Sequence, residues 1–462
     1  MSKKEKKMNN ALTDETILEI PEDEIYTYQI EGLAAPHINK PYSHYTLKKI
    51  IFIVVIVISV SLSMYFSLSI LSTEAFTFAE ISDGNYQFTK FSNPGYIDEL
   101  TINWVSDIEH PENSGKTNEI HINLIEDAPE TMPELPVTTK EDFFDYCKYV
   151  KRNDQLAAIE NSKKFPYFEI VEDKTKPVTS VKEYAINGDG YIKTIYIGEN
   201  VLEIDGKAFY SCWALQRIIV DENNPNYCDI DGVLYTKDKK TVVCYPCDRD
   251  EYLREKYGFP LELWEGILRD SMEREVTTPE LYNEIYSEYR EKVMTYVIPS
   301  TVETVGELCF NYSALATVYL PEGLKKVDNL GFFEMPNMRD FYTYITENAV
   351  EDTSFEEARE LNTYLSLPDG LTYIGTDAFS FNKAMNYIFI PASVTYIGHH
   401  AFWESCYEEG GEIKGIPQLN IEMSEEEFKE KVETGDQWTP IYDFNLLRKI
   451  PVSYGAQREK NA

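Results

Sequence analysis

The sequence predicts a solenoid, a fold in which short repeats stack on one another. Two stretches, 367–379 and 390–402, match at a fixed offset of 23 residues, with Pro, Ile, Gly, Ala and Phe in the same places. A fixed offset of this size, carried by about six copies, is typical of stacked repeats. The other copies form two further pairs, which begin at Val178 and Val201 and at Val302 and Leu324.

Each copy predicts one strand and one turn. Ile388 and Ile390 stand two residues apart, a spacing that indicates a strand with one buried face. Pro391 ends this strand, because proline cannot donate to a ladder. Phe379 and Phe402 then follow a small residue at the turn, where we expect them to fill the core. One copy cannot cover its own apolar face, so the copies must stack.

A family resemblance supports this interpretation. The repeated pattern I-x-I-P-x-x-V-x-x-I-G-x-x-A-F-x-x-C resembles the BspA-like leucine-rich repeats of bacterial surface proteins. Residues 224–246 also look like the hairpin insert of that family. The resemblance covers 178–406, with insertions at about 221–292 and 336–364. It implies an extracellular right-handed solenoid with a parallel β-sheet and a role in adhesion or ligand binding, and it supplies no catalytic residues.

Composition excludes several function classes. The chain has 462 residues and a formal net charge of −36, which argues against nucleic acid and against anionic lipid headgroups, because both need a basic patch. Seven cysteines in a chain of this length do not make a disulfide scaffold. We expect no cofactor.

The amino-terminal part predicts a membrane anchor. Residues 1–49 are polar and are expected to form a disordered cytoplasmic tail. Residues 50–73 carry no charge and are long enough to span a bilayer as a signal anchor. Lysines precede this span and acidic residues follow it, so we expect the amino terminus inside and the repeats outside the cell membrane.

The remaining segments flank or interrupt the repeats. Residues 74–177 predict a small α+β spacer or amino-terminal cap, with a helix from Thr139 to about Asn161. Residues 249–292 predict a helical insertion, within which Thr278-Pro279-Glu280 is a good helix start. Residues 407–462 predict a carboxyl-terminal cap and tail.

The predicted ligand face consists of aromatic residues that lie between or beside inward aliphatic residues on the strands. An exposed stack of aromatic side chains would suit binding, since tyrosine offers a large contact area at low entropic cost. The alternatives are that aromatics simply suit strands, or that the insertion helices cover this face. The predicted residues are Tyr196, Tyr319, Tyr387 and Phe389.

Other candidate sites favour structural roles. Cys244 and Cys247 form a C-x-x-C at the end of a hairpin strand, where a structural role is favoured over a local disulfide or a metal site. His399 and His400 are interpreted as turn residues, and Asn311 begins a glycosylation sequon. No metal site and no catalytic motif is predicted, so we do not expect an enzyme.

The sequence therefore predicts a cell-surface adhesion or ligand-binding protein with an extracellular protein or glycan partner. Two other function classes stay open. One is a membrane sensor or scaffold whose tail recruits a cytoplasmic partner. The other is an enzyme within the inserted segments.

Overall fold

The computed structural model describes residues 75–458 with several gaps. All described residues belong to one compact unit. The predicted tail and membrane span, 1–49 and 50–73, lie outside the described residues. Within the described part of the chain, no helix is long and apolar enough to cross a bilayer. The gaps are 83, 94–96, 110–116, 120–123, 126, 161–163, 167, 260–276, 346–361, 383, 386, 406, 410–411, 416–417, 436–440 and 444–447.

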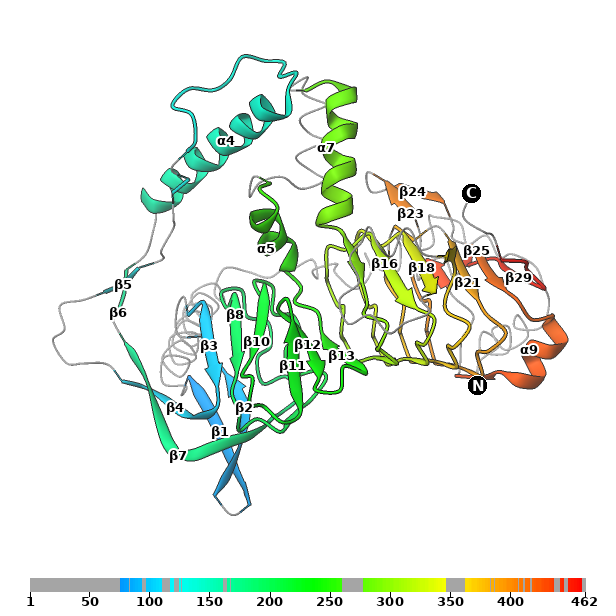
Figure 1. Cartoon of the computed structure of the whole chain (residues 1–462), viewed down its shortest axis with the longest axis horizontal. Coiled ribbons are helices and arrows are strands. Elements are labelled where there is room, and N and C mark those ends of the chain that lie inside the picture. The colour runs from blue at the N-terminus through cyan, green and yellow to red at the C-terminus, as the bar shows by residue number, and fades with distance from the viewer. Residues whose placement is uncertain are drawn as a thin grey trace, which may run out of the picture. The chain divides into compact units, whose positions relative to one another are not determined.

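Four copies of the repeat, from Val302 to Phe402, stack through parallel pairing on two sheets (Figure 1). The predicted leucine-rich-repeat type of fold, with a parallel sheet, is confirmed. The longer strands are β14 (Thr295–Val297), β16 (Thr317–Pro321) and β18 (Asp340–Ile345), with β19 (Asn362–Leu365) antiparallel at the edge. The short strands are β15 (Thr304–Val305), β17 (Lys326–Val327), β20 (Tyr373–Ile374) and β22 (Tyr396–Ile397).

The strand ladders continue beyond residue 406, where the sequence suggested only a cap and tail. β25 (Gln418–Ile421) pairs in parallel with β21 (Tyr387–Ile390), and β29 (Val452–Tyr454) follows it. β26 (Glu433–Thr434) extends the short-strand ladder from β22. The helix α9 (Glu425–Lys431) lies between β25 and β26 in the chain and starts with the capping box of Ser424 and Glu427. Two antiparallel pairs complete this part: β23 (Tyr407–Glu409) with β24 (Glu412–Gly415), and β27 (Ile441–Asp443) with β28 (Arg448–Lys449).

The amino-terminal strands share a core with the first copies. Leu100 and Ile102 of β3 lie beside Ile195 and Ile197 of β8 in a parallel pair. All four side chains are buried in the same cluster as Val178. This stretch therefore packs directly on the first copies, and the choice between a cap and a spacer stays a prediction. The strands are β1 (Phe76–Ser82), β2 (Asn85–Phe91), β3 (Glu99–Ile102), β4 (Trp104–Glu109), β7 (Glu169–Val181), β8 (Thr194–Ile197), β9 (Glu203–Ile204) and β10 (Arg217–Val220).

The predicted hairpin is present and joins the short-strand sheet. Asp231 and Gly232 make its turn with φ values of 49° and 81°. Such left-handed backbone is characteristic of a two-residue hairpin loop. Its last strand then pairs in parallel with β15. The strands are β11 (Tyr227–Ile230), β12 (Val233–Thr236) and β13 (Thr241–Cys244).

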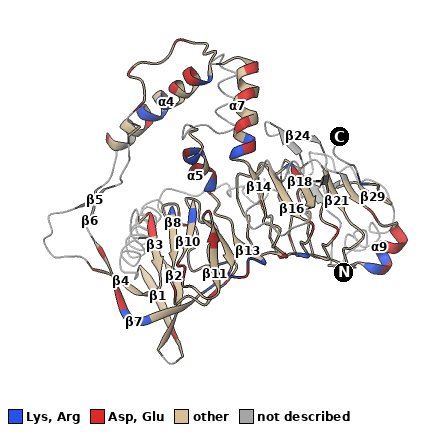
Figure 2. Cartoon of the chain, in the orientation of Figure 1, with Lys and Arg blue, Asp and Glu red and all other residues tan. Residues whose placement is uncertain are grey.

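Three helices form a separate apolar cluster. α4 (Lys140–Glu160) packs through Phe143 and Cys147 against α7 (Pro279–Lys292) and α5 (Arg249–Lys256). The Thr278 hydroxyl accepts from the backbone N–H of Leu281, which confirms the predicted start of α7. Ile159, near the end of α4, is exposed and lies outside this cluster. The strand β5 (Thr117–Glu119) precedes α4 in the chain and β6 (Lys164–Pro166) follows it, and the two strands pair with each other. Figure 2 shows that these helices carry many charged residues, whereas the strands are largely uncharged.

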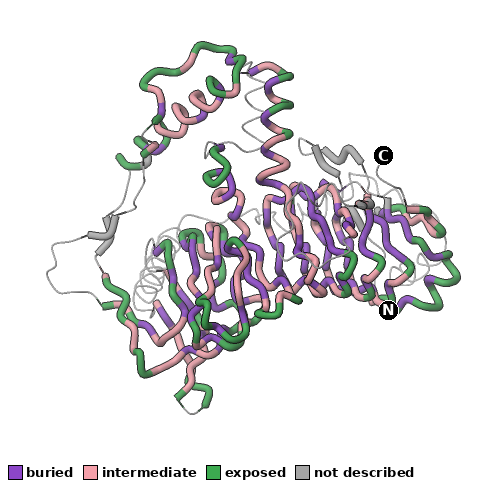
Figure 3. Tube along the Cα trace, in the orientation of Figure 1, coloured by how far each residue is buried: buried purple, intermediate pink, exposed green. Residues whose placement is uncertain are grey.

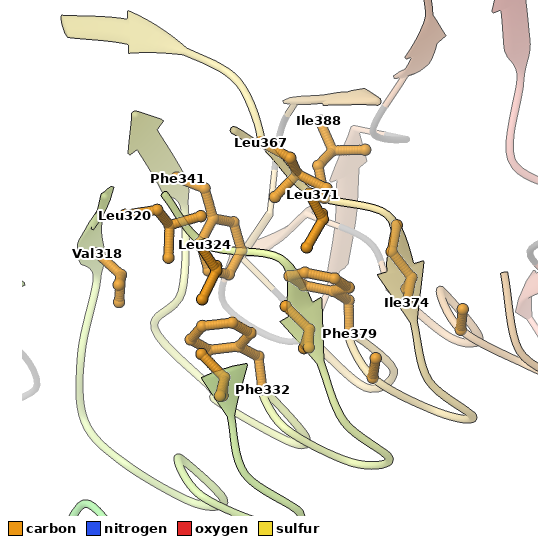
Figure 4. Packing of buried hydrophobic residues seen from close by; sticks show 14 of the residues in the cluster. Val318, Leu320, Leu324, Phe332, Phe341, Leu367, Leu371, Ile374, Phe379 and Ile388 are labelled. Carbon is orange, nitrogen blue, oxygen red and sulfur yellow. The ribbon is translucent and has the colours of Figure 1, made fainter. Parts of the chain in front are cut away.

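The core of the repeats is a column of phenylalanines, here called the plug ladder. Phe310, Phe332, Phe379 and Phe402 are fully buried and stack in sequence, with ring centroids 4.9, 5.3 and 5.3 Å apart. Figure 4 shows Phe332 and Phe379 among aliphatic residues of the strands and turns, with Phe341 beside Phe332, and Figure 3 shows that the strands of the repeats are largely buried. The expected role of Phe379 and Phe402 as core fillers is confirmed.

Candidate functional site

Two residues of the predicted ligand face are buried. Tyr319 is 7% exposed and Phe389 is 0% exposed, whereas Tyr196 and Tyr387 are half-buried. The Tyr196 hydroxyl lies 3.5 Å from a carboxylate oxygen of Glu99 on the neighbouring strand. The expectation of an open aromatic face is therefore wrong at Tyr319 and Phe389. The binding role assigned to the four residues stays a prediction.

Neighbouring elements explain this burial. The Tyr319 ring stacks on Tyr342 of β18 with centroids 5.3 Å apart, in a cluster that includes the fully buried Tyr344. The Arg458 guanidinium lies 5.4 Å from the ring centroid of Phe389, and Asp369 pairs with it. These aromatics form a second packing layer on the outer side of the strands.

The helical insertion also contacts these strands through hydrogen bonds. Arg290 of α7 donates to the Thr317 hydroxyl at 3.3 Å and to the Asp340 carboxylate at 2.9 Å. Thr317 and Asp340 are register partners at the start of β16 and β18. The alternative in which insertion helices cover part of this face therefore has a physical basis.

The C-x-x-C thiols are poor nucleophiles. Cys244 and Cys247 are half-buried free thiols, and Cys247 donates to the carbonyl of Cys212. Burial raises the pKa of Cys247 to about 12 and raises the pKa of Cys244 further. A redox cysteine needs a lowered pKa, because the thiolate is the reactive form. The geometry fits the structural interpretation, and within the described residues no group of three His, Cys, Asp or Glu could hold a metal ion.

The remaining sequence candidates also have local roles. The His400 ring packs on Trp403 with centroids 3.7 Å apart, and His399 lies against His400 in the same turn. Asn311 is 6% exposed, and its side-chain amide donates to the carbonyl of Leu308. The side chain of Asn311, the acceptor residue of the sequon, is therefore buried in the folded chain.

A surface row of aromatic rings, which the sequence analysis did not identify, runs along the turn side of the copies. We call it the aromatic stripe. Successive ring centroids lie 6.0, 6.1, 6.3 and 5.6 Å apart from Tyr184 to Phe381, and Trp213 lies 4.4 Å from Tyr312 beside the row. Trp213 is 50% exposed and Tyr184 is 43% exposed, while the others are half-buried. The stripe consists of Tyr184, Tyr210, Trp213, Tyr312, Phe333 and Phe381.

The backbone of the turns holds the stripe in place. Leu308 and Tyr312 adopt positive φ angles of 55° and 58°, and the same left-handed pair recurs at Asp377 and Phe381. The backbone N–H of Tyr312 donates to the carbonyl of Phe333, the stripe residue of the next copy. This turn buries the plug phenylalanine and leaves the residue one or two places later at the surface. An aromatic at one of these two places in successive copies is the signal that could have revealed the stripe.

Polar groups accompany the stripe. The Tyr210 and Tyr312 hydroxyls lie 3.2 Å apart, and Lys207 pairs with Glu307 at 3.1 Å. Burial, the Tyr210 hydroxyl and the nearby Glu334 carboxylate raise the pKa of Tyr312, which therefore keeps its proton as a donor. Asp189, whose carbonyl accepts from the Trp213 backbone N–H, adds a further carboxylate. The stripe thus combines ring surface with hydrogen-bonding groups.

Comparison with known proteins identifies the repeats. The family described as BspA type leucine rich repeat region matches residues 135–229 and 280–408 in six copies. The chain carries BspA-type leucine-rich repeats. The family predicted from the sequence is confirmed. No curated protein matches the chain.

Several solved structures are similar to parts of this leucine-rich repeat protein. A leucine rich cell surface protein from Faecalibacterium prausnitzii shares 22% identity over 55% of this chain and 54% of its own, with a TM-score of 0.33. A leucine-rich repeat protein from Eubacterium ventriosum shares 17% over 57% and 55%, with a TM-score of 0.29. The pneumococcal vaccine antigen PcpA shares 12% over 61% and 60%, with a TM-score of 0.33. The chain spans about half to three fifths of these proteins, and scores this low carry no argument about its function.

Proposed function

We propose that the chain is a membrane-anchored cell-surface protein whose repeat solenoid binds an extracellular ligand, as in adhesion. The observation that carries this proposal is the aromatic stripe, which keeps Trp213 and Tyr184 about half exposed on a folded, acidic surface. Exposed apolar patches with polar surroundings are typical of binding sites. The repeat family, whose members include surface proteins, supports the same function class. We propose a binding protein and not an enzyme, since the sequence carries no recognised catalytic motif.

The proposed anchor is the uncharged segment 50–73. Lys48 and Lys49 directly precede it, and Glu74 directly follows it. This charge order favours a cytoplasmic amino terminus and external repeats.

Protease treatment of intact cells tests this topology. A chain tagged at both ends should lose its carboxyl-terminal tag to added protease and keep its amino-terminal tag. Permeabilised cells, in which both tags are cut, serve as the control. A carboxyl-terminal tag that survives on intact cells would overturn the orientation.

Ligand capture by cells that display the full chain tests the binding function. The cells should retain ligands on an array of extracellular proteins and glycans, and Trp213→Ala should reduce this retention. The double variant Tyr196→Ser/Tyr387→Ser tests whether the half-exposed residues of the originally predicted face also take part. Equal retention by cells with and without the chain would contradict the proposed function.

A membrane sensor or scaffold is the second candidate. It rests on residues 1–49, which the lysine bias places on the cytoplasmic side. Cross-linking in intact cells should then recover a cytoplasmic partner with the full chain and not with a chain that lacks residues 2–40. This candidate fails if both chains recover the same proteins.

A further inference from the structure

We propose that the aromatic stripe binds a neutral, extended polysaccharide. This inference rests on the proposed function of the repeats as a ligand-binding module, and it names the surface and the ligand class. The stripe provides one ring or more in each of five successive copies, from Tyr184 to Phe381. A ligand that uses such a row must itself be linear and repetitive.

The spacing of the stripe favours a sugar chain. Copies that are joined by strand pairing lie about 4.8 Å apart, and the ring contacts of the stripe are 5.6 to 6.3 Å long. An extended polysaccharide presents an apolar pyranose face at each residue, at a spacing close to that of the copies. A polyproline segment repeats its faces every three residues, which is roughly 9 Å. It would contact only every second copy, whereas the stripe has a ring in each of five successive copies.

The two most exposed rings of the stripe offer its largest contact surface. Trp213 lies beside Tyr312 and is 50% exposed, and Tyr184 is 43% exposed at the first copy. Rigid aromatic side chains give large contact area with few torsions to immobilise. A sugar ring stacked on Trp213 would lie beside Tyr312, whose hydroxyl is paired with that of Tyr210 and has the Glu334 carboxylate nearby.

The charges beside the stripe decide between ligand classes. Three acidic residues lie beside the stripe: Asp189, Glu307 and Glu334. Lys207 pairs with Glu307, and the four side chains together carry a net negative charge. A polyanion would be repelled here, in keeping with the net charge of −36. A lipid bilayer would have to take up these carboxylates, and burial of a charged side chain in a bilayer is unfavourable. Neutral sugar hydroxyls, in contrast, can donate to these carboxylates.

The test uses the purified full chain in detergent micelles with insoluble polysaccharides. Cellulose, xylan and mannan are the neutral extended probes, and polygalacturonate is the anionic probe. The variants are Trp213→Ala and Phe333→Ala, alone and combined, with Trp213→Phe as the variant that keeps a ring. Tyr257→Ala is the matched control, because Tyr257 is also an aromatic residue, 44% exposed, but lies beyond α5 and off the stripe.

We expect the parent chain to bind at least one neutral probe. The dissociation constant should be about tenfold or more larger for Trp213→Ala, and larger again for the double variant. Trp213→Phe should retain part of the affinity, and Tyr257→Ala should bind like the parent chain. Equal binding by all variants, or binding to polygalacturonate alone, would overturn the inference. Melting curves recorded on each variant separate lost binding from lost folding.

The outcome also separates this inference from the proposed function. If the displayed chain captures a protein or a proline-rich peptide through Trp213 and no neutral polysaccharide, the polysaccharide inference is wrong and the binding function stands. If intact cells with the chain capture nothing on any array, the proposed function is wrong as well.

Discussion

Two aromatic ladders run through the same copies and differ in what they can do. The plug ladder of Phe310, Phe332, Phe379 and Phe402 is fully buried, with the three successive pairs stacked at interplanar angles of 16°, 20° and 7°. Four residues of the aromatic stripe, Tyr210, Tyr312, Phe333 and Phe381, come one or two places after the buried Phe of their copy. The stripe is half-exposed, and the successive rings of its row are tilted or edge to face. The parallel stacking fits a close-packed core, and the looser row fits a surface that meets a ligand.

The backbone separates the two ladders. In the turn that follows Phe310, the next residue but one, Tyr312, has a φ of 58°, and Phe381 repeats this two places after Phe379 with a φ of 61°. Left-handed backbone at a residue with a large side chain is uncommon and indicates a strongly determined turn. Aromatic residues so close in sequence therefore reach either the buried core or the surface. Substitutions in the plug ladder should lower stability, and substitutions in the stripe should mainly weaken binding.

The largest effect is expected in the plug ladder. Phe379→Ala and Phe402→Ala should each lower the free energy of unfolding by about 3–5 kcal/mol, because each removes a fully buried ring from a close-packed core. Denaturant unfolding of the full chain in detergent measures this. Phe333→Ala is the matched stripe control and should cost less. Since the rings of Phe379 and Phe402 stack, the double variant should deviate from additivity.

A smaller effect is expected where the backbones of neighbouring copies approach. A Cβ atom on Gly398 would lie 2.4 Å from the backbone nitrogen of Thr376, which cannot move without shifting the adjacent copy. Gly398→Ala should therefore cost about 1–3 kcal/mol, as overpacking does. Gly323→Ala is the control, since the nearest atom there is 4.0 Å away. Equal melting temperatures for the two variants would mean that this contact does not determine the spacing of the ladders.

The repeat periodicity predicted the plug ladder and missed the stripe for a physical reason. The frame was visible because every copy needs the same residues inside: Ile374 and Ile397 on the strand, then Phe379 and Phe402 at the plug. A surface position has no such requirement. The stripe uses the first place after the plug in Phe333 and the second in Tyr312 and Phe381, so no single column of the repeat shows it.

The exposure of the outward strand residues was mispredicted at two positions. Strand alternation predicts which way a side chain points, but it does not predict which other elements pack over that side chain. Tyr319 does alternate with the buried Val318 and Leu320, but Tyr342 and Tyr344 come from β18, more than 20 residues away in the chain. The cover of Phe389 by Arg458 depends on the carboxyl-terminal segment, which has no repeat frame. The place of β3 beside β8 was not predicted either, since β3 precedes that strand by 95 residues.

The junction where the hairpin and helices interrupt the copies adds a pH-dependent term that neither ladder has. Burial and the neighbouring Asp250 carboxylate raise the pKa of Asp248 to about 8. The unfolded chain releases this proton near pH 4, whereas the folded chain keeps it to about pH 8. Stability should therefore fall by about 1–2 kcal/mol between pH 5 and pH 8, since solvent reduces the full effect. Asp248→Asn should flatten this decline, and Asp154→Asn, at an exposed site on α4, should not.

The smallest effect on stability is expected in the stripe, and it separates the ladders most clearly. Trp213→Ala should change the free energy of unfolding by less than about 1 kcal/mol, because the side chain is 50% exposed and its main ring contact, Tyr312, is itself half-buried. The same variant should weaken ligand binding about tenfold or more. Unfolding curves and binding isotherms of one protein preparation measure both. A loss of stability as large as that of Phe379→Ala would place Trp213 in the core and remove the distinction between the two ladders.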